Sequence, residues 1–235
     1  MPSPSANPST TSGKEYRAAG SLSSAILLAF TGGSLDAFIY INHGHVFATA
    51  MTGNGALLGV AILHHNYLQA FHHLLPIFGF SLGVFLATVL DNHRKHHTAV
   101  IGLLCEIFVL LIASFLPGRF PDFLFVPIIA IAAAFQVTIF HRVDSYTYFS
   151  TFMTGNLLYA VNGLYAAGDQ RAEGRRRFFD LSSVILAFLV GAIAGAILAP
   201  RFLNHSLWFL SLPPIFVLAR VIIRGDTALQ PLKPR

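Results

Sequence analysis

Apolar residues in this chain form long runs almost free of charge, rather than alternating with polar residues. Several runs reach the roughly 20 residues that a helix needs to cross a bilayer, and others lie near the lower limit of about 17. Continuous runs argue against the alternating strands of an outer-membrane barrel. The pattern predicts an all-α integral membrane protein. Its apolar runs cover residues 22–41, 46–63, 74–90, 99–116, 123–140, 146–167, 181–199 and 206–223.

The chain also contains an internal repeat. Residues 47–54 read FATAMTGN and residues 149–156 read FSTFMTGN, so six of the eight positions are identical at a spacing of 102 residues. Upstream, GGSLDAF around Asp36 aligns loosely with AAAFQVT around Gln136. Thr-Gly-Asn is not typical of apolar segments, so a chance similarity between two such segments explains its recurrence poorly. The repeat indicates duplication of one membrane unit.

The repeat divides the chain into two units and two tails. We expect the first membrane unit at residues 21–117 and the second at 118–224. The first 20 residues are polar and rich in Pro and Ser, which predicts a disordered N-terminal tail, and residues 225–235 form a short C-terminal tail.

Small residues recur in both units at a spacing of four, which places them along one stripe of a helix. Such stripes let two helix backbones approach closely in a membrane. We therefore expect them to be helix-packing surfaces. Gly79, Gly83 and Ala87 in the first unit match Ala187, Gly191 and Gly195 in the second.

Composition agrees with a lipid environment. Hydrophobic residues make up 54% of the chain and charged residues 11%, against roughly 25% charged in an average soluble protein. The net charge is +5, but the 15 Lys and Arg residues lie in short connectors and tails. They do not form a basic face with interleaved aromatic residues, so we expect the lipid bilayer, and no nucleic acid, as the partner. The sequence is also compatible with a homo-oligomer.

The basic residues also bear on the number of spans. If all eight runs cross with the N-terminus inside, 11 of the 15 Lys and Arg residues lie inside. If the two Thr-Gly-Asn segments are re-entrant or broken, six spans remain and 13 of the 15 lie inside, all but Arg119 and Arg201. The positive-inside rule favours six spans with both termini cytoplasmic. Three spans per unit would give the units opposite orientations, an inverted 3+3 arrangement common in transporters.

A resemblance to a known family rests on these motifs. The first span ends in Gly-x-x-Asp-Ala (Gly33, Asp36, Ala37), and the doubled Thr-Gly-Asn follows. Residues 22–223 resemble the YoaK-like family of bacterial inner-membrane proteins, usually described as six-span and of unknown function. The resemblance implies a multi-pass protein of the inner cell membrane but no substrate. The family's second unit often has Gln-Asn-Ala where this chain has Gln136, Val137 and Thr138.

Asp36 and Glu106 are acids well inside expected spans. An ionised side chain at the bilayer centre costs about 3 kcal/mol on insertion scales, so such residues usually face a cavity or a partner. Handling of a cation or proton is one interpretation. A protonated acid that hydrogen-bonds between helices for structural reasons is the other.

The repeated motif and the residue aligned with Asp36 complete the candidate site. If the units face each other across a pseudo-twofold axis, these groups meet near the midplane, where transporter sites lie. The alternative is structural, with Asn and Thr capping a helix after a break and Gly easing the turn. The expected solute path comprises Asp36, Thr52, Gly53, Asn54, Glu106, Gln136, Thr154, Gly155 and Asn156.

Neither catalysis nor a cofactor is indicated, because no nucleophile, zinc-protease, phosphate-loop or dinucleotide motif occurs. His93, His96 and His97 have a helical spacing that could bind a metal, but histidine at the membrane interface is the commoner explanation, and we predict no metal site. The favoured function is a secondary transporter or channel for a small solute. A non-transporting scaffold or regulatory subunit, and less so a lipid-acting enzyme, remain alternatives.

Overall fold

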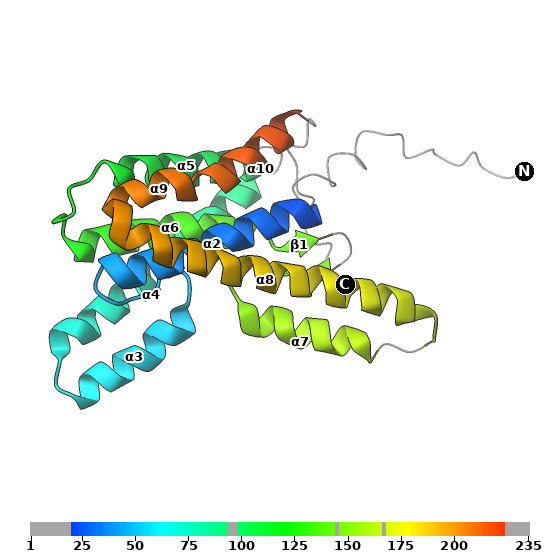
Figure 1. Ribbon diagram of the computed structural model, residues 1–235, viewed down its shortest axis with the longest axis horizontal. Coiled ribbons are helices and arrows are strands. Elements are labelled where there is room, and N and C mark those ends of the chain that lie inside the picture. The colour runs from blue at the N-terminus through cyan, green and yellow to red at the C-terminus, as the bar shows by residue number, and fades with distance from the viewer. Residues whose placement is uncertain (1–19, 94–97, 144–145, 166–167, 224–235) are drawn as a thin grey trace, which may run out of the picture.

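The computed structural model describes residues 20–93, 98–143, 146–165 and 168–223, and these ranges are almost entirely helical (Figure 1). Among them, four helical stretches are long and apolar enough to cross a membrane. The prediction of an all-α membrane protein is confirmed. Apart from residue 20, the predicted tails lie outside the described residues. The four stretches are α2 (Leu22–Asn42), α4 (Tyr67–His93), α6 (Asp122–Ile139) and the segment Arg171–Ile223.

The first unit consists of two long helices, a short one between them, and a fourth helix. Helix α2 begins at an N-cap, where the Ser21 side chain accepts a hydrogen bond from the Ser24 N–H at 3.3 Å. A non-helical loop then leads to α3 (Met51–Leu63), which forms a hairpin with α4. Helix α5 (Thr98–Ser114) closes the unit.

The second unit follows the same order. After α6 comes a small antiparallel hairpin of β1 (Arg142–Val143) and β2 (Tyr146–Thr147), then α7 (Met153–Leu164). A short 3₁₀ turn, η1 (Gly168–Gln170), precedes α8 (Arg171–Phe202), which packs beside α7. Another 3₁₀ turn, η2 (Leu203–His205), links α8 to α9 (Ser206–Leu210), and α10 (Leu212–Ile223) follows.

The two units interlock, because the first helix of each lies along the third helix of the other. Helix α2 packs along α8, and α4 packs along α6. A Cβ added at Gly191 would collide with the carbonyl oxygen of Phe30, and one at Gly83 would lie 2.6 Å from that of Ile131. The small-residue stripes therefore lie where helix backbones touch, and the units do not form separate domains.

Polar groups also join the units. The Ser34 hydroxyl donates to the Gly191 carbonyl at 2.9 Å, inside the α2–α8 contact. Beyond the end of α2, the buried His43 ring lies 2.8 Å from an Asp122 carboxylate oxygen and 2.9 Å from the Asn204 side-chain oxygen. His43 thus connects the end of α2 to the start of α6 and to η2.

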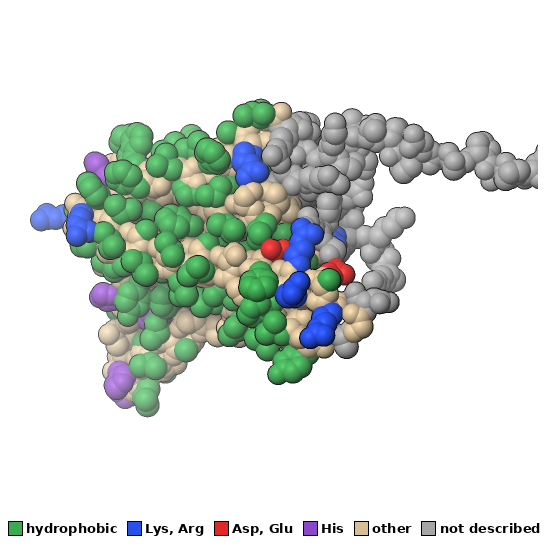
Figure 2. Space-filling view, turned by 45° about the vertical axis from the view of Figure 1, so that its right-hand side comes forward, with side chains coloured by type: hydrophobic (Ala, Val, Ile, Leu, Met, Phe, Trp, Pro, Cys, Tyr) green, Lys and Arg blue, Asp and Glu red, His purple; other side chains and the backbone are tan. Residues whose placement is uncertain are grey.

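Hydrophobic side chains cover the middle of the molecule, whereas charged side chains and histidines gather towards its two ends (Figure 2). Along α8, exposed Arg171, Arg175 and Arg176 stand at the beginning and exposed Arg201 at the end. The stretch between them at 181–199 has no charge. This distribution is that of a protein surrounded by lipid at mid-height.

Helix boundaries differ from the apolar runs at several points. Helices α3 and α7 begin only at the motif methionines, because the residues before them fold back as loops. Helix α8 begins at Arg171, ten residues before its apolar run. The sequence interpretation missed the hairpin β1–β2, because strands of two residues are too short to show a period.

Candidate functional site

The asparagine of each motif holds the loop that precedes its helix. The Asn54 side chain accepts a hydrogen bond from the Phe47 N–H at 2.9 Å and donates one to the Phe47 carbonyl at 2.8 Å. Asn156 does the same with Phe149, at 2.9 and 2.5 Å. Both asparagines are buried. Their amides are therefore engaged by the backbone in the same way in both units.

The motif glycines leave room for the phenylalanine seven residues before each asparagine. A Cβ added at Gly53 would lie 3.1 Å from the Phe47 ring, and one added at Gly155 would lie 3.1 Å from the Phe149 ring. The motif thus encodes one local structure twice, a phenylalanine loop folded onto the first turn of a short helix.

These two short helices begin at a shared cavity. Helices α3 and α7 start near the middle of the long axis of the molecule and run outwards in opposite directions (Figure 1). The cavity has a volume of about 270 Å³. Neither helix has a side-chain hydrogen bond capping its N-terminus, at Ala50 or at Phe152. The cavity is lined by Ala50, Met51, Thr52, Thr151, Phe152, Met153, Thr154 and Phe188.

Two helix N-termini, one from each unit, therefore lie at this cavity. The first turn of a helix leaves backbone N–H groups without intrahelical partners. Together with the helix dipole, they make a helix start electropositive. Two such starts, with the exposed hydroxyls of Thr52 and Thr154 beside them, can donate hydrogen bonds to a ligand from both sides.

Behind the start of α3 lies Asp36. Its carboxylate accepts hydrogen bonds from the N–H and the hydroxyl of Thr49, each at 2.7 Å. Asp36 is buried and is not among the residues that line the cavity. In the first unit, the loop before the short helix thus binds a carboxylate supplied by the chain itself.

The second unit has a different group at the aligned position. The Gln136 amide nitrogen donates to the Leu28 carbonyl at 3.1 Å and to the Ser150 hydroxyl at 2.9 Å. Thr151, which matches Thr49 in the repeat, is buried. Among the described residues, its hydroxyl oxygen has no hydrogen-bond partner. The threonine before the short helix therefore has a carboxylate partner in the first unit, and its hydroxyl has none among the described residues in the second.

Glu106 lies apart from this cavity. It is fully buried on α5, in the helix that contributes Leu103 and Ile107 to a core cluster with α2, α6 and α10. Neither carboxylate oxygen has a hydrogen-bond partner in the described part of the chain. Of the nine residues expected to form a path, only Thr52 and Thr154 line the cavity.

Sequence reasoning missed most of the cavity wall. Thr151, Phe152 and Met153 lie in or beside the motif, so a closer look at the repeat could have found them. Phe188 lies on α8 and reaches the cavity only because α8 packs along α2. No sequence signal marked it.

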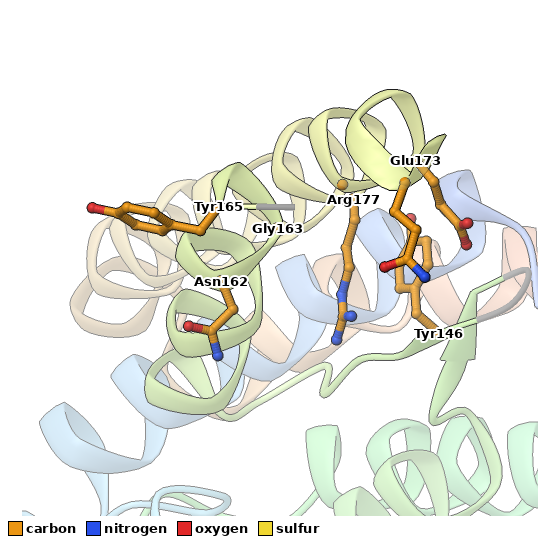
Figure 3. A pocket seen from close by; sticks show the side chains of 8 residues that line it. Tyr146, Asn162, Gly163, Tyr165, Glu173 and Arg177 are labelled. Atoms are coloured by element: carbon orange, nitrogen blue, oxygen red, sulfur yellow. The ribbon is translucent and has the colours of Figure 1, made fainter. Parts of the chain in front are cut away.

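A second cavity of about 400 Å³ lies within the second unit alone, between α7, α8 and β2. Figure 3 shows Arg177 extending from α8 and Asn162 from α7 at this place. The Arg177 guanidinium lies 4.9 Å from the centre of the Tyr159 ring and 5.6 Å from that of Tyr146. Tyr146 in turn donates a hydrogen bond to Asp180. Because the arginine already lies against two aromatic rings and the cavity belongs to one unit only, this cavity is a weaker candidate for a path between the units than the shared one.

Among the described residues, no three His, Cys, Asp or Glu side chains lie close enough to hold a metal ion. The spacing of His93, His96 and His97 falls partly outside the described residues. The donors at the shared cavity are N–H and hydroxyl groups, which suit an anion or a neutral acceptor rather than a metal ion.

Comparison with known proteins agrees with the resemblance seen in the motifs. The chain is 29% identical over 192 residues to the UPF0700 transmembrane protein YoaK of Bacillus subtilis (strain 168), covering 77% of this chain and 85% of that protein. No solved structure matches. Residues 24–220 match the family model described as Protein of unknown function (DUF1275). The chain belongs to this family, as the YoaK-like motifs had predicted.

Proposed function

We propose that this protein is a secondary transporter or channel for a small solute. One observation carries the proposal: two short helices, one from each unit, begin at the same cavity from opposite sides. Discontinuous helices that meet between repeated units are the usual setting of a transporter site. A scaffold would more naturally have a dry, filled centre.

The proposed arrangement in the membrane has six spans and two re-entrant segments. Helices α3 and α7 contain 13 and 12 residues, a length of about 18–20 Å. The hydrocarbon core is about 30 Å thick, so neither helix crosses it alone. Each loop would enter to mid-depth, and each short helix would return to the side it came from, with both termini in the cytoplasm.

A labelling experiment tests this arrangement. The chain has one cysteine, Cys105, which is first replaced by serine. In this Cys105→Ser background, single cysteines replace exposed His65, between α3 and α4, and exposed Arg175, near the start of α8. Six spans with re-entrant segments place these two positions on opposite faces of the membrane, and eight spans place both inside. An impermeant thiol reagent should therefore label His65→Cys from outside and Arg175→Cys only after permeabilisation. Labelling of both positions from the same face would overturn the proposed topology.

A solute path is tested without knowing the solute. Cysteines at Thr52 and Thr154, in the same background, should react with a small charged thiosulfonate because the cavity admits water. Leu186→Cys on α8 is the matched control, since this exposed apolar side chain faces the expected lipid zone and should not react. If neither Thr52→Cys nor Thr154→Cys reacts from either face, the centre is closed and the scaffold alternative is preferred.

A further inference from the structure

The two units differ in charge where each short helix turns into the long helix that follows it. The turn after α3 has exposed His64 and His65, and residues 18–93 contain no Lys or Arg. The turn after α7 leads instead into α8, which has four arginines in its first seven residues. Figure 2 shows basic side chains gathered at one end of the molecule, with hydrophobic ones directly beside them.

Two of these four arginines already have neighbours. Arg176 forms an ion pair with Asp180 at 3.6 Å, and Arg177 lies against two tyrosine rings. Arg171 and Arg175 are exposed, and neither takes part in an ion pair within the described part of the chain. They stand about 6 Å apart along the helix axis and on the same face, so both can reach one ligand.

Arg171 and Arg175 line a hollow of about 590 Å³ between the end of α7 and the start of α8. The two helices touch here, because a Cβ added at Gly163 would lie 2.6 Å from the Gly174 carbonyl oxygen. Leu164 of α7, whose side chain is 53% exposed, gives the hollow an apolar wall. None of the described residues that line it is acidic. The hollow thus combines two unpaired cations with an apolar side.

An exposed apolar stripe continues from this hollow along α8. Phe179, Leu186 and Ile193 are 60, 61 and 60% exposed. Their spacings of four and seven residues keep them on the helix face that Arg175 begins. Leu157, on the neighbouring α7, is also exposed. A molecule that uses both parts of this surface has an anionic head and a long apolar tail.

We propose that this surface binds an anionic phospholipid, with its phosphate at Arg171 and Arg175 and an acyl chain along Phe179 and Leu186. The fork of donors on an arginine matches the oxygens of a phosphate group. Basic pockets between membrane helices at the cytoplasmic side are a common setting for anionic headgroups, and the proposed topology places the hollow on that side. The site does not depend on the solute path.

Two simpler explanations leave part of the surface unused. The positive-inside rule accounts for an excess of arginine at this end, but not for two unpaired arginines that line one hollow at the head of an apolar stripe. A soluble phosphate would contact the arginines and leave the stripe uncovered. A phospholipid covers both.

The test is a lipid titration of the full-length protein in detergent, followed by native mass spectrometry. Phosphatidylglycerol and phosphatidylcholine with identical acyl chains are compared, and we expect the protein to bind phosphatidylglycerol more tightly. The double variant Arg171→Gln, Arg175→Gln should weaken this binding roughly 30-fold, about fivefold for each arginine. Because both side chains are exposed, the variant should fold. Arg171→Lys with Arg175→Lys keeps both charges and should keep the preference for phosphatidylglycerol.

The matched control removes two exposed arginines from the other end of the molecule. Arg119→Gln with Arg201→Gln changes the net charge by the same amount and should bind phosphatidylglycerol normally. An equal loss in this control, or unchanged binding by the folded Arg171→Gln, Arg175→Gln variant, would remove the lipid from this hollow. Equal affinity of the unaltered protein for phosphatidylcholine would overturn selection by charge. Displacement of phosphatidylglycerol by inorganic phosphate would favour a soluble anion instead.

Discussion

The motif of the first unit and that of the second share a backbone and differ in what surrounds it. In both, an asparagine amide holds a phenylalanine seven residues earlier, and a glycine makes room for the ring. In the first unit the Asp36 carboxylate accepts a hydrogen bond from the hydroxyl of the threonine before the helix, and in the second that hydroxyl has no partner within the described part of the chain. The part that recurs is therefore structural, and the two units diverge in the group that faces this threonine.

Substitutions at the contacts between the units should have the largest effects. Gly191→Leu would force a side chain against the Phe30 backbone, and Gly83→Leu against the Ile131 backbone. We expect each to cost more than about 3 kcal/mol and to lower the yield of folded protein. Gly59→Leu on α3 is the matched control, because nothing lies within 4 Å of an added Cβ there. Yield and melting temperature in detergent measure the effect, and a tolerated Gly191→Leu would show that the two helices can separate.

The asparagines should show the next largest effect, and an equal one in the two units. Asn54→Ala and Asn156→Ala each remove two hydrogen bonds to buried backbone, which we expect to cost about 2–3 kcal/mol. Asn54→Asp and Asn156→Asp keep the acceptor and lose the donor, so they should also destabilise. Denaturant titration of all four variants checks the symmetry. The prediction from sequence that these asparagines bind solute stays a prediction, and normal stability with lost transport would favour it.

Asp36→Asn makes the first unit resemble the second. We expect the variant to fold, with a loss of about 1–2 kcal/mol, because two charge-assisted hydrogen bonds become weaker neutral ones. If Asp36 couples a cation or proton to solute movement, coupled transport in proteoliposomes should disappear. Full coupled transport by Asp36→Asn would leave the carboxylate with a structural role only.

Ser34→Ala should have the smallest effect. Its hydroxyl donates across the α2–α8 contact to Gly191, whereas the α4–α6 contact has Ala134 against Gly83. The second contact therefore holds without such a bond. We expect a loss of about 0.5–1 kcal/mol, as for other hydrogen bonds between membrane helices. A loss as large as that of Gly191→Leu would mean that the two contacts are not equivalent.

The sequence could predict what depends on long patterns. Membrane character followed from uncharged runs, and the recurrence of one local structure at Asn54 and Asn156 followed from six shared positions in the motif. The spacing of Gly83 and Gly191 predicted which helix faces make contacts. It could not show that each of these faces packs against a helix of the other unit. No local sequence pattern shows which distant helices pack together. It is the packing of α8 along α2 that places Phe188 at the cavity.

The candidate site was harder to predict, because polar residues in an apolar run look alike whether they bind a ligand or the backbone. Asn54 and Asn156 had the composition of ligand-binding groups, yet their amides are engaged by Phe47 and Phe149. Thr151 was one residue among several small polar ones, and only its neighbours distinguish it from Thr49. Glu106 lies within a helix, as expected. The depth of a residue along its own helix, however, does not give its distance from residues on another helix.

The interlocking of the units also sets an order for biosynthesis. Ser34 on α2 meets Gly191 on α8, 157 residues later, so α2 enters the membrane long before the surface it packs against has been made. Until then its glycine face must rest against lipid or a temporary companion, and the first unit alone cannot bury it. A chain cut between α5 and α6 should therefore yield halves that are degraded singly and that assemble when they are made together.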